Sequence, residues 1–154
     1  MTRTAHYSSP IGPIVLTYND TALTGLQFAS PADGSTSEST TDHFLLTACF
    51  RWLDLYFSGH HPDFTPPIDL RGTAFQQRVW HELLTIPYGQ TVTYGEIARR
   101  VGCRSAQAVG GAVGRNPIAL IVPCHRVVGS DGTLTGYAFG LRRKQYLLQL
   151  EQSN

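Results

Sequence analysis

The sequence predicts an α+β fold in two parts, an N-terminal antiparallel sheet with one helix and a C-terminal lobe of short helices. Three observations lead to this prediction. Strand-like runs separated by turn residues fill the first thirty positions, the apolar spacing becomes helical after residue 42, and two helix-capping sequences follow beyond residue 72. The chain has 154 residues, enough for one good core or two small ones.

The N-terminal part is expected to span residues 1–58. Residues 14–18 and 23–28 read as antiparallel strands, since a turn-forming Asn-Asp-Thr segment separates them. Residues 30–41 are rich in Ser and Thr and have no apolar anchor, which predicts a mobile surface loop. From Asp42 to near Gly59 the spacing predicts an amphipathic helix whose apolar face carries Phe44, Ala48, Trp52, Leu55 and Tyr56.

Residues 59–72 contain three prolines and two glycines, which predicts a linker between the two parts. His60 and His61 within it are isolated, and we expect them to be solvated rather than to bind a metal.

The C-terminal part, residues 73–154, is predicted to contain a helix-turn-helix. A capping box at Thr73 opens one helix, a second box at Thr93 opens a short helix that Gly102 ends, and a third helix runs from Ser105 to Gly114. Two short helices joined by a tight glycine-containing turn are typical of DNA-binding proteins. Helix pairs of this kind also occur in proteins that never touch DNA.

The third predicted helix contains Gly110, Gly111 and Gly114. Each glycine costs about 1 kcal/mol of helix propensity relative to alanine, so a reason for keeping them is needed. Small side chains allow either a close approach to a nucleic-acid groove or tight packing against a neighbouring helix. The residues themselves leave both interpretations open.

Cys124 is the first candidate for chemistry, because it follows an apolar run at residues 118–122 and precedes His125. The run predicts a buried strand that delivers the cysteine at its end. A thiol is a useful nucleophile only as the thiolate, and a neighbouring histidine helps to form it. The alternative is a small buried hydrophobic residue.

The three cysteines are widely spaced and odd in number, which argues against a disulfide framework and a structural zinc site. We expect free thiols, no metal and no cofactor. The sequence has neither a run of about 18 apolar residues nor a signal peptide, so a cytoplasmic protein without membrane contact is expected.

Charge is distributed unevenly along the chain. The net charge is +1, with −5 on residues 1–70 and +6 on residues 71–154, which points to a polyanion as the partner of the second half unless the imbalance is random. A final helix at residues 141–152 carries Arg142, Arg143 and Lys144 on its first turn. These cations form either a solvated face or a contact with phosphates. The glycine-rich segment 135–140 before them is able to curl around a small planar ligand.

From Gly72 to Glu151 the chain resembles the O6-alkylguanine-DNA alkyltransferases. Its motifs occur in order and at consistent spacing: PCHRV at 123–127, NP at 116–117, YGEIA at 94–98, AVG at 108–110, GY at 136–137 and LLQLE at 147–151. The resemblance implies a C-terminal winged-helix or helix-turn-helix domain. The N-terminal part resembles, more loosely, the ribonuclease-H-like sheet with helix of this family and lacks the zinc cysteines of some members.

The resemblance implies a repair enzyme that flips O6-alkylguanine out of duplex DNA and moves the alkyl group to Cys124, with O4-alkylthymine as a further candidate substrate. The product is a thioether, which water cannot hydrolyse, so each molecule acts once. His125 resembles the base that takes the thiol proton through a water, and Glu151 the carboxylate that orients it. Asn116 resembles the residue that fixes the turn beside the cysteine, and Tyr94 the donor to the leaving guanine.

The resemblance also assigns binding residues. Backbone groups of Val127 would read the base, and a loop of Tyr137, Ala138 and Phe139 would close over it. The DNA-contacting set that it implies is Tyr94, Ser105, Gln107, Ala108, Gly110, Gly111, Arg115 and Arg126. The partner would be double-stranded DNA, bound by a monomer, with cooperativity along DNA left open.

Two positions depart from the family pattern. Gln107 stands where many members carry an arginine finger, which predicts weaker DNA affinity rather than lost chemistry. Phe139 stands where glycine is usual, so it would narrow the pocket mouth or provide a stacking wall.

Three other functions are compatible with parts of this sequence. A lesion-binding protein without a nucleophile is disfavoured because Cys124 is present. A sequence-specific regulator is disfavoured because the third helix offers only Gln107 for reading base edges. A Cys-His hydrolase remains open, and it predicts multiple turnover.

Overall fold

The computed structural model describes residues 2–29, 43–134 and 136–153. The chain divides into two compact units, residues 1–70 and 71–154, and each unit has its own buried core. The surface loop expected at residues 30–41 lies outside the described residues.

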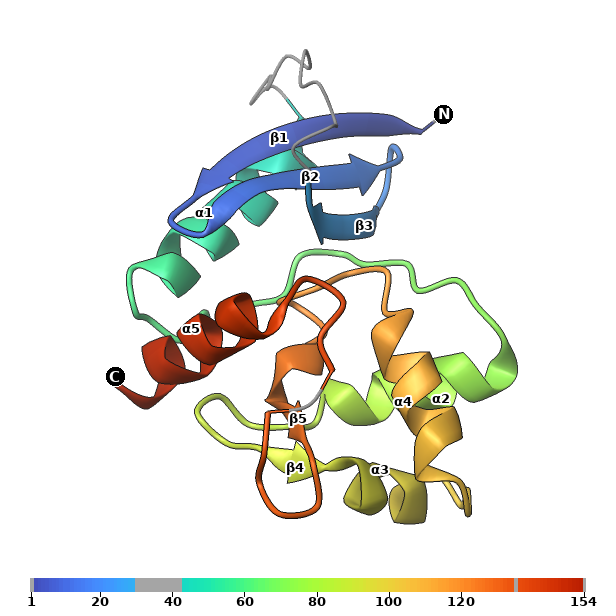
Figure 1. Ribbon diagram of the computed structural model, residues 1–154. Helices are drawn as coiled ribbons and strands as arrows, with labels where there is room; N and C mark the ends of the chain where they lie inside the picture. The colour runs from blue at the N-terminus through green and yellow to red at the C-terminus, as the bar shows by residue number, and fades with distance from the viewer. Residues whose placement is uncertain (1, 30–42, 135, 154) are drawn as a thin grey trace. The chain divides into compact units, whose positions relative to one another are not determined.

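The N-terminal unit is built on a three-stranded antiparallel sheet in the order β1-β2-β3 (Figure 1). Its strands are β1 (Arg3–Ser9), β2 (Gly12–Tyr18) and β3 (Leu23–Phe28). Ala5 pairs with Leu16, which pairs in turn with Leu26, and all three side chains are buried. Strands β2 and β3 were predicted. Strand β1 was not, because only one of its seven side chains is buried and the alternating pattern is therefore weak.

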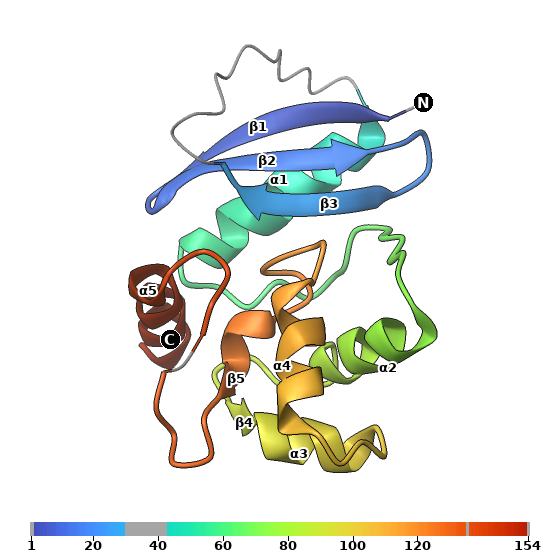
Figure 2. The same ribbon diagram turned by 45° about the vertical axis from the view of Figure 1, so that its right-hand side comes forward.

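Helix α1 (Phe44–Phe57) lies across one face of this sheet (Figures 1 and 2). The helix was predicted, but its buried face is displaced from the expected one. Its buried residues are Leu45, Leu46, Cys49, Trp52, Leu53 and Tyr56. Phe44, expected on the apolar face, is 63% exposed. His43 caps the helix by accepting from Leu45 N at 3.1 Å, so Phe44 falls in the first turn, beyond the core.

Part of the segment expected to be a linker is hydrogen-bonded to the sheet. Leu23 N donates to Pro67 O at 2.8 Å, and Asp69 N donates to Leu23 O at 2.9 Å, which places Ile68 in a parallel bridge with Leu23. Residues 59–70 therefore belong to the N-terminal unit.

The C-terminal unit contains the predicted helix-turn-helix. Helix α2 (Ala74–Leu83) begins at the Thr73 capping box, and α3 (Tyr94–Arg100) and α4 (Ala106–Gly114) follow. Gly102, at a φ of 70°, closes the turn between α3 and α4 with a backbone conformation that favours glycine. Helix α4 packs on α2 and α3, and the indole nitrogen of Trp80 donates to Ala112 O at 2.8 Å.

The second predicted capping box is only half formed. The Thr93 hydroxyl accepts from Glu96 N at 3.0 Å, as expected. The Glu96 carboxylate instead pairs with Arg99 and Arg100 on the same helix. Two cations one turn away attract the carboxylate more strongly than the neutral N-cap amide.

The prediction of a strand at residues 118–122 is wrong. These residues form a buried succession of turns in which Val122 N donates to Ile118 O at 3.1 Å and Leu120 has a φ of 71°. All five side chains are buried. The apolar run therefore correctly indicated burial, but it did not indicate whether the backbone is extended.

Two short strands bring the later part of the chain beside α3. Strand β5 (Val127–Val128) pairs in parallel with β4 (Val92–Thr93), which leads directly into α3. The last helix, α5 (Leu141–Gln152), has the bounds expected from the sequence. No helix of the described part of the chain is long and apolar enough to cross a membrane.

Candidate active site

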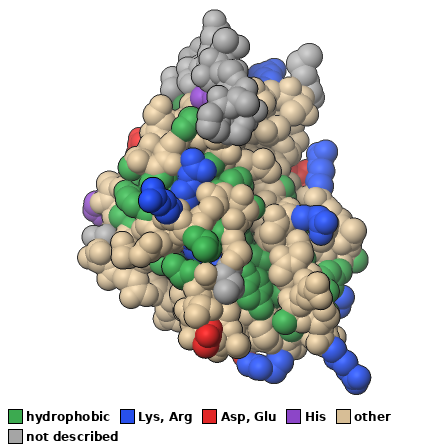
Figure 3. Space-filling model, in the orientation of Figure 1, with side chains coloured by type: hydrophobic (Ala, Val, Ile, Leu, Met, Phe, Trp, Pro, Cys, Tyr) green, Lys and Arg blue, Asp and Glu red, His purple; other side chains and the backbone are tan. Residues whose placement is uncertain are grey.

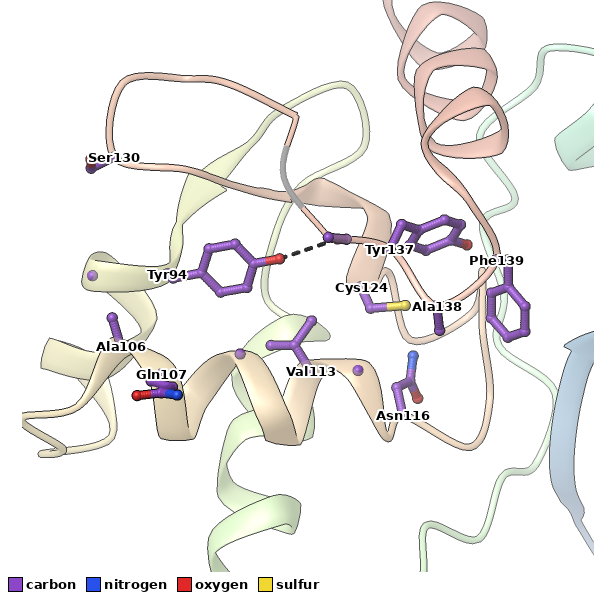
Figure 4. Close-up of a pocket in the computed structure, with 14 residues that line it drawn as sticks. Tyr94, Ala106, Gln107, Val113, Asn116, Cys124, Ser130, Tyr137, Ala138 and Phe139 are labelled. Atoms are coloured by element: carbon purple, nitrogen blue, oxygen red, sulfur yellow. Dashed lines mark hydrogen bonds between the residues drawn. The ribbon is translucent and has the colours of Figure 1, made fainter.

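A cavity of about 680 Å³ opens in the C-terminal unit, and the sulfur of Cys124 lies in its wall (Figure 4). Three parts of the unit surround it: the start of α3, one side of α4 and the loop before α5. Its lining residues are Tyr94, Gly95, Ala106, Gln107, Gly110, Val113, Gly114, Asn116, Cys124, Ser130, Gly136, Tyr137, Ala138 and Phe139. The cavity is large enough for a nucleobase and mostly apolar in its lining.

Cys124 begins the 3₁₀ turn η1 (Cys124–Arg126), and its side chain is 5% exposed. The expected extended chain at this point is therefore a tight helical turn. Burial raises the pKa of the Cys124 thiol, while a hydrogen bond with Asn116 and the charge of Lys144 oppose that rise. The resting thiol is protonated, so it needs a base before it can attack.

His125 is fully buried behind the cavity wall and is bonded to Glu151. Its Nε2 lies 2.5 Å from Glu151 Oε2. Burial lowers the pKa of His125, although Glu151 acts in the opposite direction, so the imidazole is neutral. A carboxylate on Nε2 selects the tautomer with its proton there, and Nδ1 then carries the lone pair that a base requires.

Glu151 is held from three directions. Besides His125, it accepts from Arg126 Nε at 2.8 Å and from Gly89 N at 3.0 Å. Burial alone would raise the pKa of Glu151, but the hydrogen bonds from His125 and Arg126 outweigh it and hold the pKa at about 2. The carboxylate is therefore ionised at all physiological pH values.

Arg126, predicted to contact DNA, is occupied inside the protein. Its side chain is buried, two of its nitrogens donate to Glu151, and Nη1 donates to Ile86 O at 2.8 Å. A buried arginine must satisfy its donors inside the protein, and the nearest acceptor is the carboxylate that also holds His125. The position of Arg126 in the PCHRV motif gave no indication of this.

Asn116 holds the turn that precedes the cysteine. Its Nδ2 donates to Val122 O at 2.8 Å, and its Oδ1 accepts from Ile118 N at 3.0 Å. The same side chain lowers the pKa of the Cys124 thiol, against the effect of burial. One amide thus ties both ends of the turn at residues 118–122 together and also acts on the nucleophile.

Tyr94 and the loop before α5 form the wall across from α4. The Tyr94 hydroxyl donates to Gly136 O at 3.4 Å, shown as the dashed line in Figure 4. Burial raises the pKa of Tyr94, and ionisation of Cys124 raises it further, so the phenol keeps its proton. The rings of Tyr137 and Phe139 meet edge to face at 5.4 Å, and Phe139 is part of the cavity lining.

The predicted DNA-contacting residues divide into two groups. Gln107 and Gly110 line the cavity, whereas Ala108, Gly111 and Arg115 are on α4 or at its end without lining it. Ser105 caps α4 by accepting from Ala108 N at 3.0 Å. Figure 3 shows hydrophobic side chains gathered beside α4 and basic ones at the lower edge of the molecule, around α3 and the turn into α4.

Val127 and Lys144 are both buried. Val127, whose backbone is predicted to read the base, is not among the residues that line the cavity, and its carbonyl accepts from Lys144 Nζ at 2.5 Å. Lys144, expected on a solvated or phosphate-contacting face, is completely buried. One signal in the sequence distinguishes Lys144 from Arg142 and Arg143: it is a lysine, and every other strongly basic residue of the chain is an arginine.

Comparisons with known proteins agree with this arrangement. The model of the 6-O-methylguanine DNA methyltransferase DNA binding domain matches residues 74–153, and the model of the ribonuclease-like domain of the same protein matches residues 2–70. The methylated-DNA–protein-cysteine methyltransferase of Mycobacterium tuberculosis is 49% identical over 153 residues, which cover 96% of this chain and 93% of the relative. That of Methanosarcina barkeri is 48% identical, covering 95% and 94%.

Among solved structures, the crystal structure of Mycobacterium tuberculosis OGT in complex with DNA matches with a TM-score of 0.85 at 47% identity, covering 99% of this chain and 92% of that one. A buried thiol in a base-sized cavity beside a helix-turn-helix, with these relatives, defines a DNA repair enzyme of the cysteine alkyl-transfer class. The chain belongs to the 6-O-methylguanine DNA methyltransferase family. The family, fold class and enzyme class expected from the sequence are thereby confirmed.

Proposed function

We propose that the protein repairs O6-alkylguanine in duplex DNA by moving the alkyl group to the sulfur of Cys124. The observation that carries this proposal is the position of the Cys124 thiol in the cavity wall, followed directly by a neutral His125 that Glu151 orients from the other side. A nucleophile, a base and an orienting carboxylate are the three groups that activation of a thiol requires.

The transfer balances without a cofactor. The thiol proton passes to His125 Nδ1 through a water, and the thiolate sulfur attacks the alkyl carbon in line. The new S–C bond forms as the C–O6 bond breaks, and the electron pair of the C–O6 bond stays on the guanine. Tyr94 donates a proton to the departing base and is reprotonated from His125, which leaves guanine and a thioether.

The surface of α4 supports binding of the flipped nucleotide. Flipping is required because the reactive atom is stacked inside the duplex, and the unstacking cost must be recovered by contacts in the pocket. Gln107 lines the cavity at the start of α4, where it can fill part of the vacated stack, and the glycines of α4 allow the DNA backbone to approach closely. The loop of Tyr137, Ala138 and Phe139 covers the base.

The test is the intact mass of the protein after incubation with a duplex that carries O6-methylguanine. We expect one CH₂ unit to be added per protein molecule, on Cys124, and the reaction to stop at one equivalent. Cys124→Ser should gain nothing. Cys103→Ser is the matched control, since Cys103 is a thiol of the same unit outside the cavity lining, and it should react like the parent.

An unchanged mass with the lesion still in the DNA would reject the proposal. Continued turnover on an ester or amide, without a mass gain, would favour the Cys-His hydrolase instead. We further expect a cytoplasmic monomer. Gel filtration of the protein with and without DNA checks its oligomeric state, and cell fractionation checks its compartment.

A further inference from the structure

Lys144 is the only lysine in the chain, and its side chain is completely buried. The other eleven strongly basic residues are arginines. An ammonium group is expensive to bury unless polar partners replace its water. A chain that otherwise uses arginine has therefore placed its one compact cation inside the protein.

The contacts of Lys144 connect three parts of the active site. Its Nζ donates to Val127 O at 2.5 Å, directly after the catalytic turn, and to Gly136 O at 3.3 Å, at the start of the loop that covers the cavity. The same Nζ lies 5.9 Å from the centre of the Tyr94 ring. Gly136 O also accepts from the Tyr94 hydroxyl, so one carbonyl joins the lysine to the proton donor.

The charge of Lys144 acts on both reacting groups of the catalytic turn. Burial dominates the pKa of Cys124 and raises it, and the Lys144 charge counteracts this. Burial likewise lowers the pKa of His125, and Lys144 lowers it further, which keeps the resting imidazole in its neutral form. Burial lowers the pKa of Lys144 itself, whereas Cys124 raises it. Two other cations act nearby: Arg126 also lowers the pKa of His125, and Arg143 lowers the pKa of Tyr137 in the loop before α5.

We propose that Lys144 is a positioning residue for alkyl transfer: it ties the loop at Gly136 to the strand that follows Cys124, and its ammonium charge stabilises the attacking thiolate. The inference rests on Cys124 being the alkyl acceptor. A lysine suits this place because its charge is compact and its three rotatable donors can reach two carbonyls, whereas the donors of a guanidinium are fixed in one plane.

Because the chain has one lysine, labelling with ¹³C at lysine Cε gives a single side-chain NMR signal that belongs to Lys144. We expect this signal to show a titration step when Cys124 ionises, and the step to disappear in Cys124→Ser and after methylation of Cys124. A purely structural lysine would give the same titration in all three proteins, and that result would overturn the proposal.

Kinetics supply the second test. In Lys144→Met, which keeps an unbranched side chain and removes the terminal ammonium group, single-turnover methyl transfer should slow at least tenfold near neutral pH, and the midpoint of its pH profile should rise by about one unit. Lys144→Arg should recover part of the rate and most of the midpoint. Arg51→Met, which removes one exposed charge from the N-terminal unit, should match the parent.

A slower Lys144→Met with an unchanged midpoint would overturn the electrostatic role. If Lys144→Met does not fold, the NMR titration of the parent protein decides. A parent protein that gains no methyl group on Cys124 would refute the proposed function, while the coupling between Lys144 and the thiol would still be measured by the titration.

Discussion

The Glu151 carboxylate shows how one residue organises this site. It accepts hydrogen bonds from His125 and Arg126 of the turn η1 and from the backbone of Gly89, which lies on a separate segment of the C-terminal unit. The Arg126 guanidinium binds both of its oxygens. A buried carboxylate needs such partners to stay ionised, and an ionised Glu151 is what fixes the tautomer of His125.

The first prediction concerns the acid stability that Glu151 provides. Its pKa is about 2 in the folded protein and ordinarily 4.5, so its contribution to stability is present above the ordinary value and is lost as pH falls toward 2. The pKa difference corresponds to about 3 kcal/mol. Glu151→Gln should destabilise the protein at neutral pH by about 3 to 5 kcal/mol, because Arg126 then lacks its counter-charge.

Urea unfolding over a pH series measures this effect. The parent should lose stability through the window from about pH 5 to about pH 2, and Glu151→Gln should lose less over the same window. Parallel stability curves for the two proteins would contradict the assigned pKa.

At the scale of elements, the turn at residues 118–122 is the least expected part of the fold. It replaces a predicted strand, it is held by Asn116, and it contains Leu120 in the left-handed region with a side chain that is 1% exposed. Such a backbone costs a residue with a Cβ about 1 to 2 kcal/mol. The burial of Leu120 and its neighbours maintains this conformation in the core.

The strain at Leu120 predicts that glycine is the more stable replacement there, whereas alanine is the more stable replacement at an ordinary helical position. Leu120→Ala loses the buried side chain and keeps the strain, whereas Leu120→Gly loses the side chain and relieves the strain. We expect the glycine variant to be more stable than the alanine variant by about 1 kcal/mol. At the buried helical control Leu83, glycine should be the less stable by about 1 kcal/mol. Denaturant unfolding of the four proteins compares them, and the same order at both sites would contradict the inferred strain.

Helix α4 gives a prediction about affinity. Gln107 is exposed at the start of the helix and carries no charge, so Gln107→Arg should bind DNA several-fold more tightly, with a salt dependence steeper by about one unit of slope. Gln145→Arg, at an exposed position of α5, is the matched control and should gain less. Equilibrium binding to a labelled duplex at several salt concentrations measures both. No gain for Gln107→Arg would count against its role beside the flipped base.

At the scale of the whole molecule, opposite charges are assigned to the two units, −5 for residues 1–70 and +6 for residues 71–154. Two of the ten basic residues of the second unit, Arg126 and Lys144, are buried and serve the active site. The exposed arginines near α4 include Arg104, just before the helix begins, and Arg115, just after it ends.

This distribution predicts which charges DNA meets. Replacing Arg104 and Arg115 together by Gln should weaken binding to any duplex and reduce the slope of log affinity against log salt by about two. Replacing Arg3 and Arg51 by Gln removes the same charge from exposed positions of the first unit and should leave the slope unchanged. Equal changes of slope for both pairs would refute a DNA surface restricted to the second unit.

From the sequence we predicted most of the helices and strands, and those residues of the site that line the cavity. Helices α2, α3 and α4 were predictable because their N-caps are local: Thr73, Thr93 and Ser105 each accept from a backbone amide three residues ahead. The Cys-His pair pointed to Cys124, and the resemblance added Tyr94 and Asn116. The structure brings these three residues together at one cavity.

What the sequence could not predict depends on contacts between distant residues. Arg126 and Lys144 look like surface cations along the chain, and only the fold brings carbonyl and carboxylate oxygens to them. The turn at residues 118–122 fails for the same reason, since an apolar run reports burial without reporting the backbone conformation. Strand β1 is stabilised by its pairing with β2 rather than by its own pattern.

The hydrogen bond from Trp80 to Ala112 gives the molecule a natural optical reporter. The chain has two tryptophans, Trp52 in the first unit and Trp80 in the second, and the indole of Trp80 donates a hydrogen bond to Ala112 O in the last turn of α4. In a Trp52→Phe background, any change of fluorescence on mixing with DNA arises from the second unit alone. Binding of a lesion-bearing duplex and the covalent step could then be followed in real time, without attaching a dye.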